Sequence, residues 1–310
     1  MSFDNQRSEI IDIAKKLLAH GTAAVVIAFG EGEVDGNTVP RFFRTPEELD
    51  NMKWGETCTP NLAKYLTEKK EKVAIVAKPC DARAIIMYLV EKQIDRNNVY
   101  IIGIECAGML GKGGKSAAGC SECKVKTPPI YDILIKNPDI LKIVKDLKIE
   151  EQKAEGLKSE KDLKVEEEKL GELEYSLERF QKEMNKCILC FACRQACYGC
   201  YCKTCFVDRD IPNWLPADIN MGAKMVFHLG RAMHLAGRCV ECGACERACP
   251  SGVKIRYLIK ELSTMCKDLY GYSAGMSLEE TPAIATFNQG DREVGFMGGV
   301  DNESCCNSKK

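Results

Sequence analysis

The chain has 310 residues, of which 45% are hydrophobic and 29% charged, and its formal net charge at pH 7 is -1. This length predicts two or three structural units, and the nearly balanced charge excludes a general affinity for nucleic acid. Nineteen cysteines would indicate a disulfide scaffold in a short secreted protein. We expect no signal peptide, however, and the longest apolar stretch, residues 23–29, is too short to span a membrane. The sequence therefore predicts a cytoplasmic metal-binding protein.

Residues 1–150 are predicted to form an α/β domain. Helices are expected at residues 8–19, 61–70 and 81–92, and strands at residues 23–29, 72–77 and 99–104, so that the two alternate along the chain. This alternation predicts a small parallel sheet covered by helices. Cys80 and Cys106 then lie just beyond the carboxyl ends of two strands, which is the edge where open α/β sheets bind ligands.

Two segments differ in composition from the rest of the chain, one after the α/β domain and one at the C-terminal end. Residues 151–186 are rich in charge, with leucines at roughly helical spacing, and they predict an exposed helical connector. We favour a solvated linker helix over a partner-docking arm. The polar, glycine-rich tail, residues 287–310, is expected to be mobile.

Two cysteine runs, Cys187–Cys197 and Cys239–Cys249, share the spacing C-x2-C-x2-C-x3-C. This spacing is typical of [4Fe-4S] ligation, and in two-cluster proteins the fourth cysteine binds the other cluster. The first site is therefore predicted to consist of Cys187, Cys190, Cys193 and Cys249. The second site is predicted to consist of Cys239, Cys242, Cys245 and Cys197. A zinc ion would need only four thiolates, usually in two separated pairs, whereas each run supplies four at one place.

Residues 187–286 are predicted to form a helical domain around these two sites. Helices are expected over residues 221–236 and 253–269, and Gly237 ends the first of them. The layout is similar to the α-helical ferredoxin modules of heterodisulfide reductase and succinate dehydrogenase iron–sulfur subunits. The predicted fold class is thus an α/β domain followed by an all-α dicluster domain of ferredoxin type. So many oxygen-sensitive clusters indicate anaerobic metabolism.

A fourth site is predicted from three closely spaced cysteines, Cys200, Cys202 and Cys205. A cube has four corners, so a remote ligand is needed, and we assign Cys58, which precedes Pro60 in an ordered-looking segment. The alternative is that several cysteines outside the two runs, including Cys58, Cys80, the Cys120/Cys123 pair and the 200–205 group, are buried thiols that pack as small hydrophobic residues. Cys266, Cys305 and Cys306 are left without an assignment.

Three segments of the N-terminal part resemble the β subunits of deazaflavin-dependent hydrogenases and formate dehydrogenases. They are Lys78-Pro79-Cys80-Asp81-Ala82-Arg83, Ile102-Gly103-Ile104-Glu105-Cys106-Ala107-Gly108, and Cys120-x2-Cys123 followed by Pro128, Tyr131 and Asp132. The resemblance covers roughly residues 55–135. In that family these cysteines surround one [4Fe-4S] cluster beside a flavin. The resemblance, together with the positions of Cys80 and Cys106 at strand ends, implies a third [4Fe-4S] site. Its ligands would be Cys80, Cys106, Cys120 and Cys123.

The chain departs from this family in one respect. Only the short segment of residues 107–119 separates Cys106 from Cys120, where the family has several tens of residues that help to build the flavin and deazaflavin pocket. No G-x-G-x-x-G opens a helix here. We therefore expect FAD to be absent. The C-terminal part, from His234 to Gly275, resembles iron–sulfur subunits of bacterial formate dehydrogenases, sulfhydrogenases and heterodisulfide reductase-like complexes.

No catalytic residues are predicted, because the sequence has no evident nucleophile–base set, carboxylate pair or phosphate loop. His228 and His234 could each hydrogen-bond to a cluster, although structural histidines are the favoured interpretation. Lys78 and Arg83 could stabilise a reduced cluster or be ordinary flanking charges. The predicted function is electron transfer between a flavoprotein partner and a catalytic subunit of a cytoplasmic redox complex. The alternatives are a flavin-containing catalytic β subunit that oxidises a deazaflavin or reduces ferredoxin, and a zinc-binding assembly scaffold.

Overall fold

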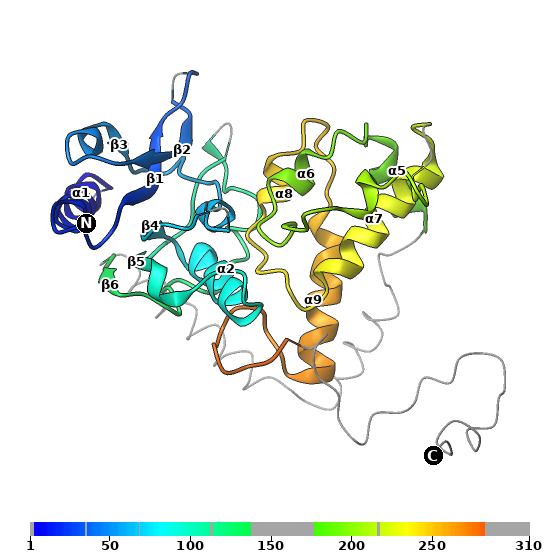
Figure 1. Cartoon of the computed structure of the whole chain (residues 1–310). Helices are drawn as coiled ribbons and strands as arrows, with labels where there is room; N and C mark the ends of the chain where they lie inside the picture. Colours follow the sequence, from blue (N-terminus) through cyan, green and yellow to red (C-terminus); the bar gives the residue numbers. More distant parts are fainter. Residues whose placement is uncertain are drawn as a thin grey trace, which may run out of the picture.

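The computed structural model describes residues 3–137 and 177–282, apart from residues 35, 68, 112, 113, 216 and 217. Most of the predicted connector, up to residue 176, and the predicted tail lie outside these residues. The described parts form an α/β N-terminal half (residues 3–137) and a helical C-terminal half (residues 177–282), which lie side by side (Figure 1).

The N-terminal half contains a six-stranded sheet with the order β2-β1-β4-β5-β6, in which β3 also pairs with β1. The strands are β1 (Val25–Glu31), β2 (Thr38–Phe43), β3 (Met52–Lys53), β4 (Val73–Ala77), β5 (Val99–Ile104) and β6 (Ile133–Ile135). Strands β1, β4, β5 and β6 run parallel, whereas β2 and β3 are antiparallel to β1. The α/β prediction is confirmed, but the sheet is mixed rather than purely parallel. The chain returns directly after β1, and such a short connection permits only antiparallel pairing.

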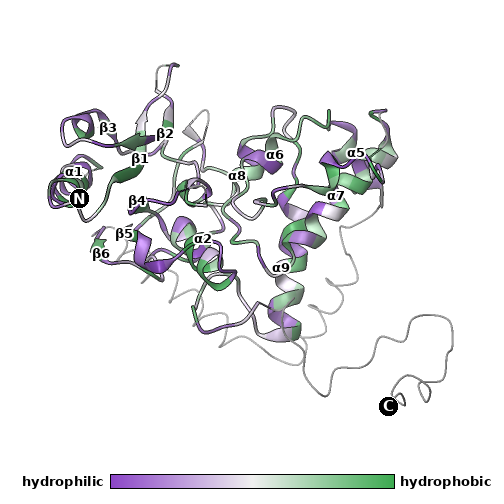
Figure 2. Cartoon of the chain, viewed as in Figure 1, coloured by the Kyte–Doolittle hydropathy of each residue, from purple (hydrophilic) through white to green (hydrophobic). Residues whose placement is uncertain are grey.

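Burial explains why the central strands form. Strand β4 is buried at every position and β1 at all but its last, as expected for branched apolar runs covered on both faces. Strand β1 is correspondingly hydrophobic in Figure 2. Helix α1 (Phe3–Ala19) packs against β1, β3, β4 and β6, and helix α2 (Pro79–Val90) packs against β4 and β5.

The helix predicted over residues 61–70 is wrong in type and length. The structure has only a short 3-10 helix, η2 (Leu62–Tyr65), at this place. Its first turn is fixed from outside, because the Leu62 amide donates to the Asp81 carboxylate at 2.7 Å. The Asn61 side chain caps the turn by accepting from the Ala63 amide at 3.1 Å. Tertiary hydrogen bonds therefore define this segment. The other 3-10 helices of the described residues are η1 (Glu48–Asn51), η3 (Arg96–Asn98) and η5 (Phe206–Asp208).

The described residues of the C-terminal half contain helices and no strand. The helices are α5 (Leu177–Asn185), α6 (Ala192–Gln195), α7 (Met221–Leu235), α8 (Ala244–Arg247) and α9 (Arg256–Tyr270). Helix α7 starts after Asn220, whose side chain caps it, and the chain leaves it through Gly237 with a φ of 64°. Both predicted long helices are therefore confirmed, although α9 starts three residues later than expected. In the part of the chain that is described, no helix is long and apolar enough to cross a membrane.

Specific hydrogen bonds join the two halves. The Arg83 guanidinium donates to the carbonyl of Ala274 at 2.8 and 3.0 Å. The Tyr88 hydroxyl donates to the Tyr198 carbonyl at 2.6 Å, and Arg238 forms an ion pair with Glu91 at 2.5 Å. Tyr272 and Ala274 also pack into the hydrophobic core of the N-terminal half. The cysteine loops of the two halves are thus held against each other.

Candidate metal centres

The four cysteines of the first site line one small cavity. They are Cys187, Cys190, Cys193 and Cys249, so the last cysteine of the second run reaches the first run. The four cysteines of the second site line another small cavity. They are Cys197, Cys239, Cys242 and Cys245, so the exchange is reciprocal. The structure therefore brings together both sets predicted from the spacing.

The two runs fold in the same way locally. In the first run the Leu189 amide donates to the Cys187 sulfur, and in the second the Glu241 amide donates to the Cys239 sulfur, each at 3.3 Å. Leu189 and Glu241 both adopt a left-handed conformation, with φ values of 52° and 56°. This backbone turns each loop around its thiols and directs an N–H group at sulfur. Such donors stabilise thiolate charge and raise cluster potentials.

His228 lies against the first site. Its Nε2 atom is 3.2 Å from the Cys187 sulfur, and its ring is buried. Burial, together with the charges of Arg231 and Lys224, lowers the pKa of His228 to about 4, so the ring is neutral at pH 7. The tautomer with hydrogen on Nε2 donates to the sulfur. His234 instead packs edge-on against the Phe206 ring, 5.4 Å away between centroids. The geometry thus separates two histidines that the sequence could not distinguish.

The four cysteines of the third site line a cavity of about 610 Å³. They are Cys80, Cys106, Cys120 and Cys123, and they share the cavity with Cys239 and Cys242 of the second site. Cys80 and Cys106 follow the parallel strands β4 and β5, which places them at the same sheet edge, as expected. Burial raises the pKa of the Cys80 thiol and raises that of Cys106 to about 11. Bound iron would supply the charge that deprotonates them.

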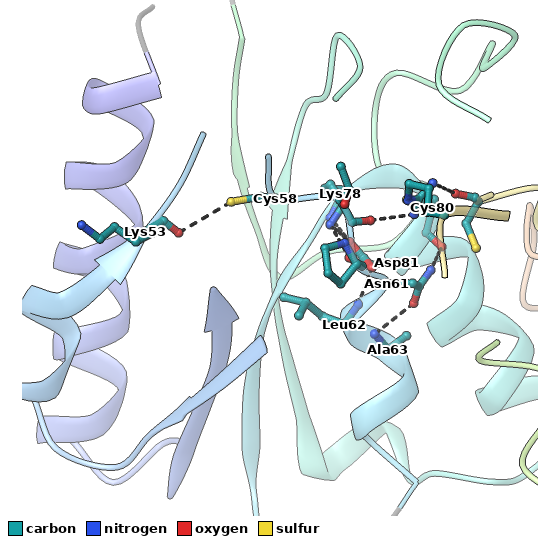
Figure 3. Close-up of polar contacts among 12 residues, drawn as sticks. Lys53, Cys58, Asn61, Leu62, Ala63, Lys78, Cys80 and Asp81 are labelled. Carbon is teal, nitrogen blue, oxygen red and sulfur yellow. Dashed lines mark hydrogen bonds and ion pairs between the residues drawn. The ribbon is translucent and has the colours of Figure 1, made fainter. Parts of the chain in front are cut away.

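Asp81 fixes the loop that carries Cys80 (Figure 3). Its carboxylate accepts the amides of Leu62 and Lys78 at 2.7 and 2.9 Å, and it forms an ion pair with Lys78 Nζ at 2.9 Å. Lys78 Nζ also donates to the Pro60 carbonyl at 3.0 Å. Burial alone would lower the pKa of Lys78, but the Asp81 carboxylate raises it overall. Lys78 is therefore a buried, paired cation.

The three cysteines of the fourth site, Cys200, Cys202 and Cys205, line a cavity of about 380 Å³. Cys58 is not among the described residues that line it. The Cys58 thiol is fully buried in the N-terminal core and points to the Lys53 carbonyl, at 3.9 Å (Figure 3). The prediction of Cys58 as fourth ligand is therefore not supported, because its segment packs into the sheet core. Cys266, which had no assignment, lines the large cavity of the third site.

Within the described residues, no three His, Cys, Asp or Glu side chains converge closely enough to bind a single metal ion. A zinc ion needs all its ligands at about 2.0–2.3 Å from one centre. A cube instead takes each thiolate on a different iron, so its ligands stand around a hollow. Cysteines that surround cavities fit a cluster better than a lone ion.

Comparison with known proteins supports the resemblance seen in the motifs. No protein-family model matches the chain. It is 25% identical over 336 residues to the F420-dependent formate dehydrogenase subunit beta of Methanocaldococcus jannaschii, covering 81% of this chain and 87% of that protein. It is 24% identical over 358 residues to the F420-dependent formate dehydrogenase 1 subunit beta of Methanococcus maripaludis, with coverages of 87% and 91%.

A solved structure of the F420-reducing [NiFe] hydrogenase complex from Methanosarcina barkeri also matches. The match covers 33% of this chain and 38% of the hydrogenase chain, at 18% identity and a TM-score of 0.30. F420 is a deazaflavin, so the two relatives confirm the predicted resemblance to β subunits of deazaflavin-dependent enzymes. The similarity extends well beyond residues 55–135, on which the motifs lie.

Proposed function

We propose that the chain is an iron–sulfur electron-transfer subunit of a multi-subunit oxidoreductase complex in the cytoplasm. Its partners would be a flavoprotein and a catalytic subunit of formate dehydrogenase, hydrogenase or heterodisulfide reductase-like type. The observation that carries the proposal is that three of the predicted cysteine sets each line a cavity, and that the second-site and third-site cavities adjoin. The two relatives, which are β subunits of F420-dependent formate dehydrogenases, support the same class of complex.

Adjoining cavities suggest a path for electrons. Cys239 and Cys242 line both the second-site cavity and the large third-site cavity. Arg247 clamps the two loops together, because it donates to the carbonyls of Ala118 and Cys242 at 2.7 and 2.6 Å. Gly243 is required at this contact, since a Cβ atom there would lie 1.9 Å from the Ala118 oxygen. In our proposal, clusters held at the second and third sites would stand on either side of this contact and would supply one-electron transfer between the halves.

Bound clusters would supply one-electron chemistry, and the chain's own groups would set their potentials. The thiolates would hold the irons, while the amides of Leu189 and Glu241 and the imidazole of His228 would donate to sulfur. We also propose that the helical half is a ferredoxin-type domain. The chain would then consist of an α/β domain (1–150), a charged connector (151–186), the ferredoxin-type domain (187–286) and a tail (287–310).

The experiment is anaerobic reconstitution of the full chain with iron and sulfide, followed by a visible spectrum and acid extraction. We expect broad charge-transfer absorption that bleaches on reduction, and no flavin in the extract. A colourless protein that folds and binds zinc would contradict the proposal and favour an assembly scaffold.

One observation favours a second candidate, the flavin-containing catalytic β subunit. The third-site cavity, at about 610 Å³, lies within the usual 300–1,000 Å³ range of cofactor pockets. Lys126, Arg256, Lys260 and Lys267 line it, and such cations suit phosphate groups. A cube held by the third site would fill part of this space. Flavin in the acid extract, together with bleaching of flavin bands by reduced F420, would establish this second function.

A further inference from the structure

Arg231 is a buried cation at the meeting point of several cysteine sites. It lies on α7, with 3% of its surface exposed, and its Nη2 atom donates to the Cys193 carbonyl at 3.2 Å. Arg231 lines both the second-site cavity and the fourth-site cavity. Cys197 lines the first of these cavities with Arg231, and Cys200 lines the second. One guanidinium thus faces cysteines of three predicted sites.

Arg231 differs from the neighbouring arginines because no carboxylate among the described residues pairs with it. Two other arginines line the fourth-site cavity, but Arg194 pairs with Asp208 at 2.8 Å and Arg238 pairs with Glu91 at 2.5 Å. The Nε atom of Arg231 is buried and has no hydrogen-bond partner within the described part of the chain. A buried guanidinium without a counter-ion is strongly unfavourable. Its position therefore calls for an anion in these cavities.

We propose that Arg231 is the shared counter-ion of the clusters at the second and fourth sites, and that it raises their midpoint potentials. This inference rests on the proposed iron–sulfur function. An oxidised [4Fe-4S] cube bound by three or four thiolates is already anionic, and reduction adds one more negative charge. A nearby buried cation stabilises the reduced form more than the oxidised form. Arg231 would therefore make both clusters easier to reduce and favour electron flow into them.

The test compares Arg231→Gln, which removes the charge, with Arg231→Lys, which keeps it. Arg194→Gln is the matched control for the second-site cluster, because Arg194 is a nearby cation that is already paired with Asp208 and does not line the second-site cavity. The full chain is reconstituted anaerobically, its iron content is measured, and EPR spectra are recorded during a redox titration. The cluster of the third site is an internal control, since Arg231 does not line its cavity.

In Arg231→Gln we expect the reduced-to-oxidised ratio of the second-site cluster, at a fixed potential, to fall at least tenfold. For a one-electron couple this equals a downward shift of about 59 mV. Arg231→Lys and Arg194→Gln should stay close to the wild type, and the third-site cluster should not shift in any variant.

Each other outcome is decisive. An unchanged midpoint potential in a fully loaded Arg231→Gln protein would overturn the inference. If Arg231→Gln does not load and Arg231→Lys loads with wild-type potentials, the charge is needed and the inference stands. If neither variant loads, Arg231 acts through packing and the inference is wrong. A wild-type chain without iron–sulfur signals would instead refute the proposed function, before any variant is made.

Discussion

Replacement of Asp81 by Asn tests how the cluster loop of the N-terminal half is held. The carboxylate is fully buried, pairs with Lys78 Nζ at 2.9 Å, and accepts the amides of Leu62 and Lys78. Asn has nearly the same size but no charge, so it leaves the Lys78 ammonium buried with the Pro60 carbonyl and, at 4.5 Å, the Phe29 ring. Removing one partner of a buried ion pair costs about 3–5 kcal/mol. We expect the free energy of unfolding to fall by that amount.

The assay is anaerobic urea unfolding of the reconstituted full chain, followed by circular dichroism. Asp50→Asn is the control, because the Lys15–Asp50 pair is solvent-exposed and should contribute less than about 1 kcal/mol. The double variant Lys78→Met/Asp81→Asn should recover most of the stability, since removing both buried charges is often nearly neutral. A loss below about 1 kcal/mol for Asp81→Asn, or a double variant as unstable as the single one, would refute this reasoning.

Three further predictions concern the clusters. Cys193→Ala and Cys245→Ala should each remove or convert one cluster, and unchanged iron content with unchanged reduced-state EPR signals in both would refute the first two sites. Cys58→Ser should keep the wild-type iron content, because the Cys58 thiol lies in the sheet core; loss of a cluster would show that Cys58 is a ligand after all. His228→Leu should lower the midpoint potential of the first-site cluster, because the Nε2–H donor to Cys187 is lost. A redox titration that shows no shift would assign His228 a structural role.

Features fixed by local sequence were predictable. Strand β5 has the predicted bounds, Val99–Ile104, because a branched apolar run can be buried only as a central strand here. Helix α7 ends within one residue of its prediction, because Gly237 takes the left-handed conformation that terminates it. The grouping of each cysteine run also follows from local spacing, which the two repeated turns at Leu189 and Glu241 explain.

Features that depend on distant contacts were not predictable. The segment after Asn61 is a short turn because the Leu62 amide donates to Asp81, which lies nineteen residues later in the chain. Cys58 was assigned as a ligand because it precedes Pro60 in an ordered-looking segment, whereas the fold places its thiol in the core beside Lys53. The role of Arg231 has no sequence signal, since an arginine on an amphipathic helix is ordinarily exposed. Its burial results from the packing of α7 against both cysteine runs.

Iron-edge anomalous diffraction from anaerobically grown crystals of the reconstituted chain tests the central claim most directly. The account predicts separate iron peaks in the first-site, second-site and third-site cavities, with a further peak beside Cys200, Cys202 and Cys205. At about four irons per cube, the four occupied sites should give about 16 irons per chain. Cavities without iron density in a folded protein, or peaks that appear only at the zinc edge, would contradict it.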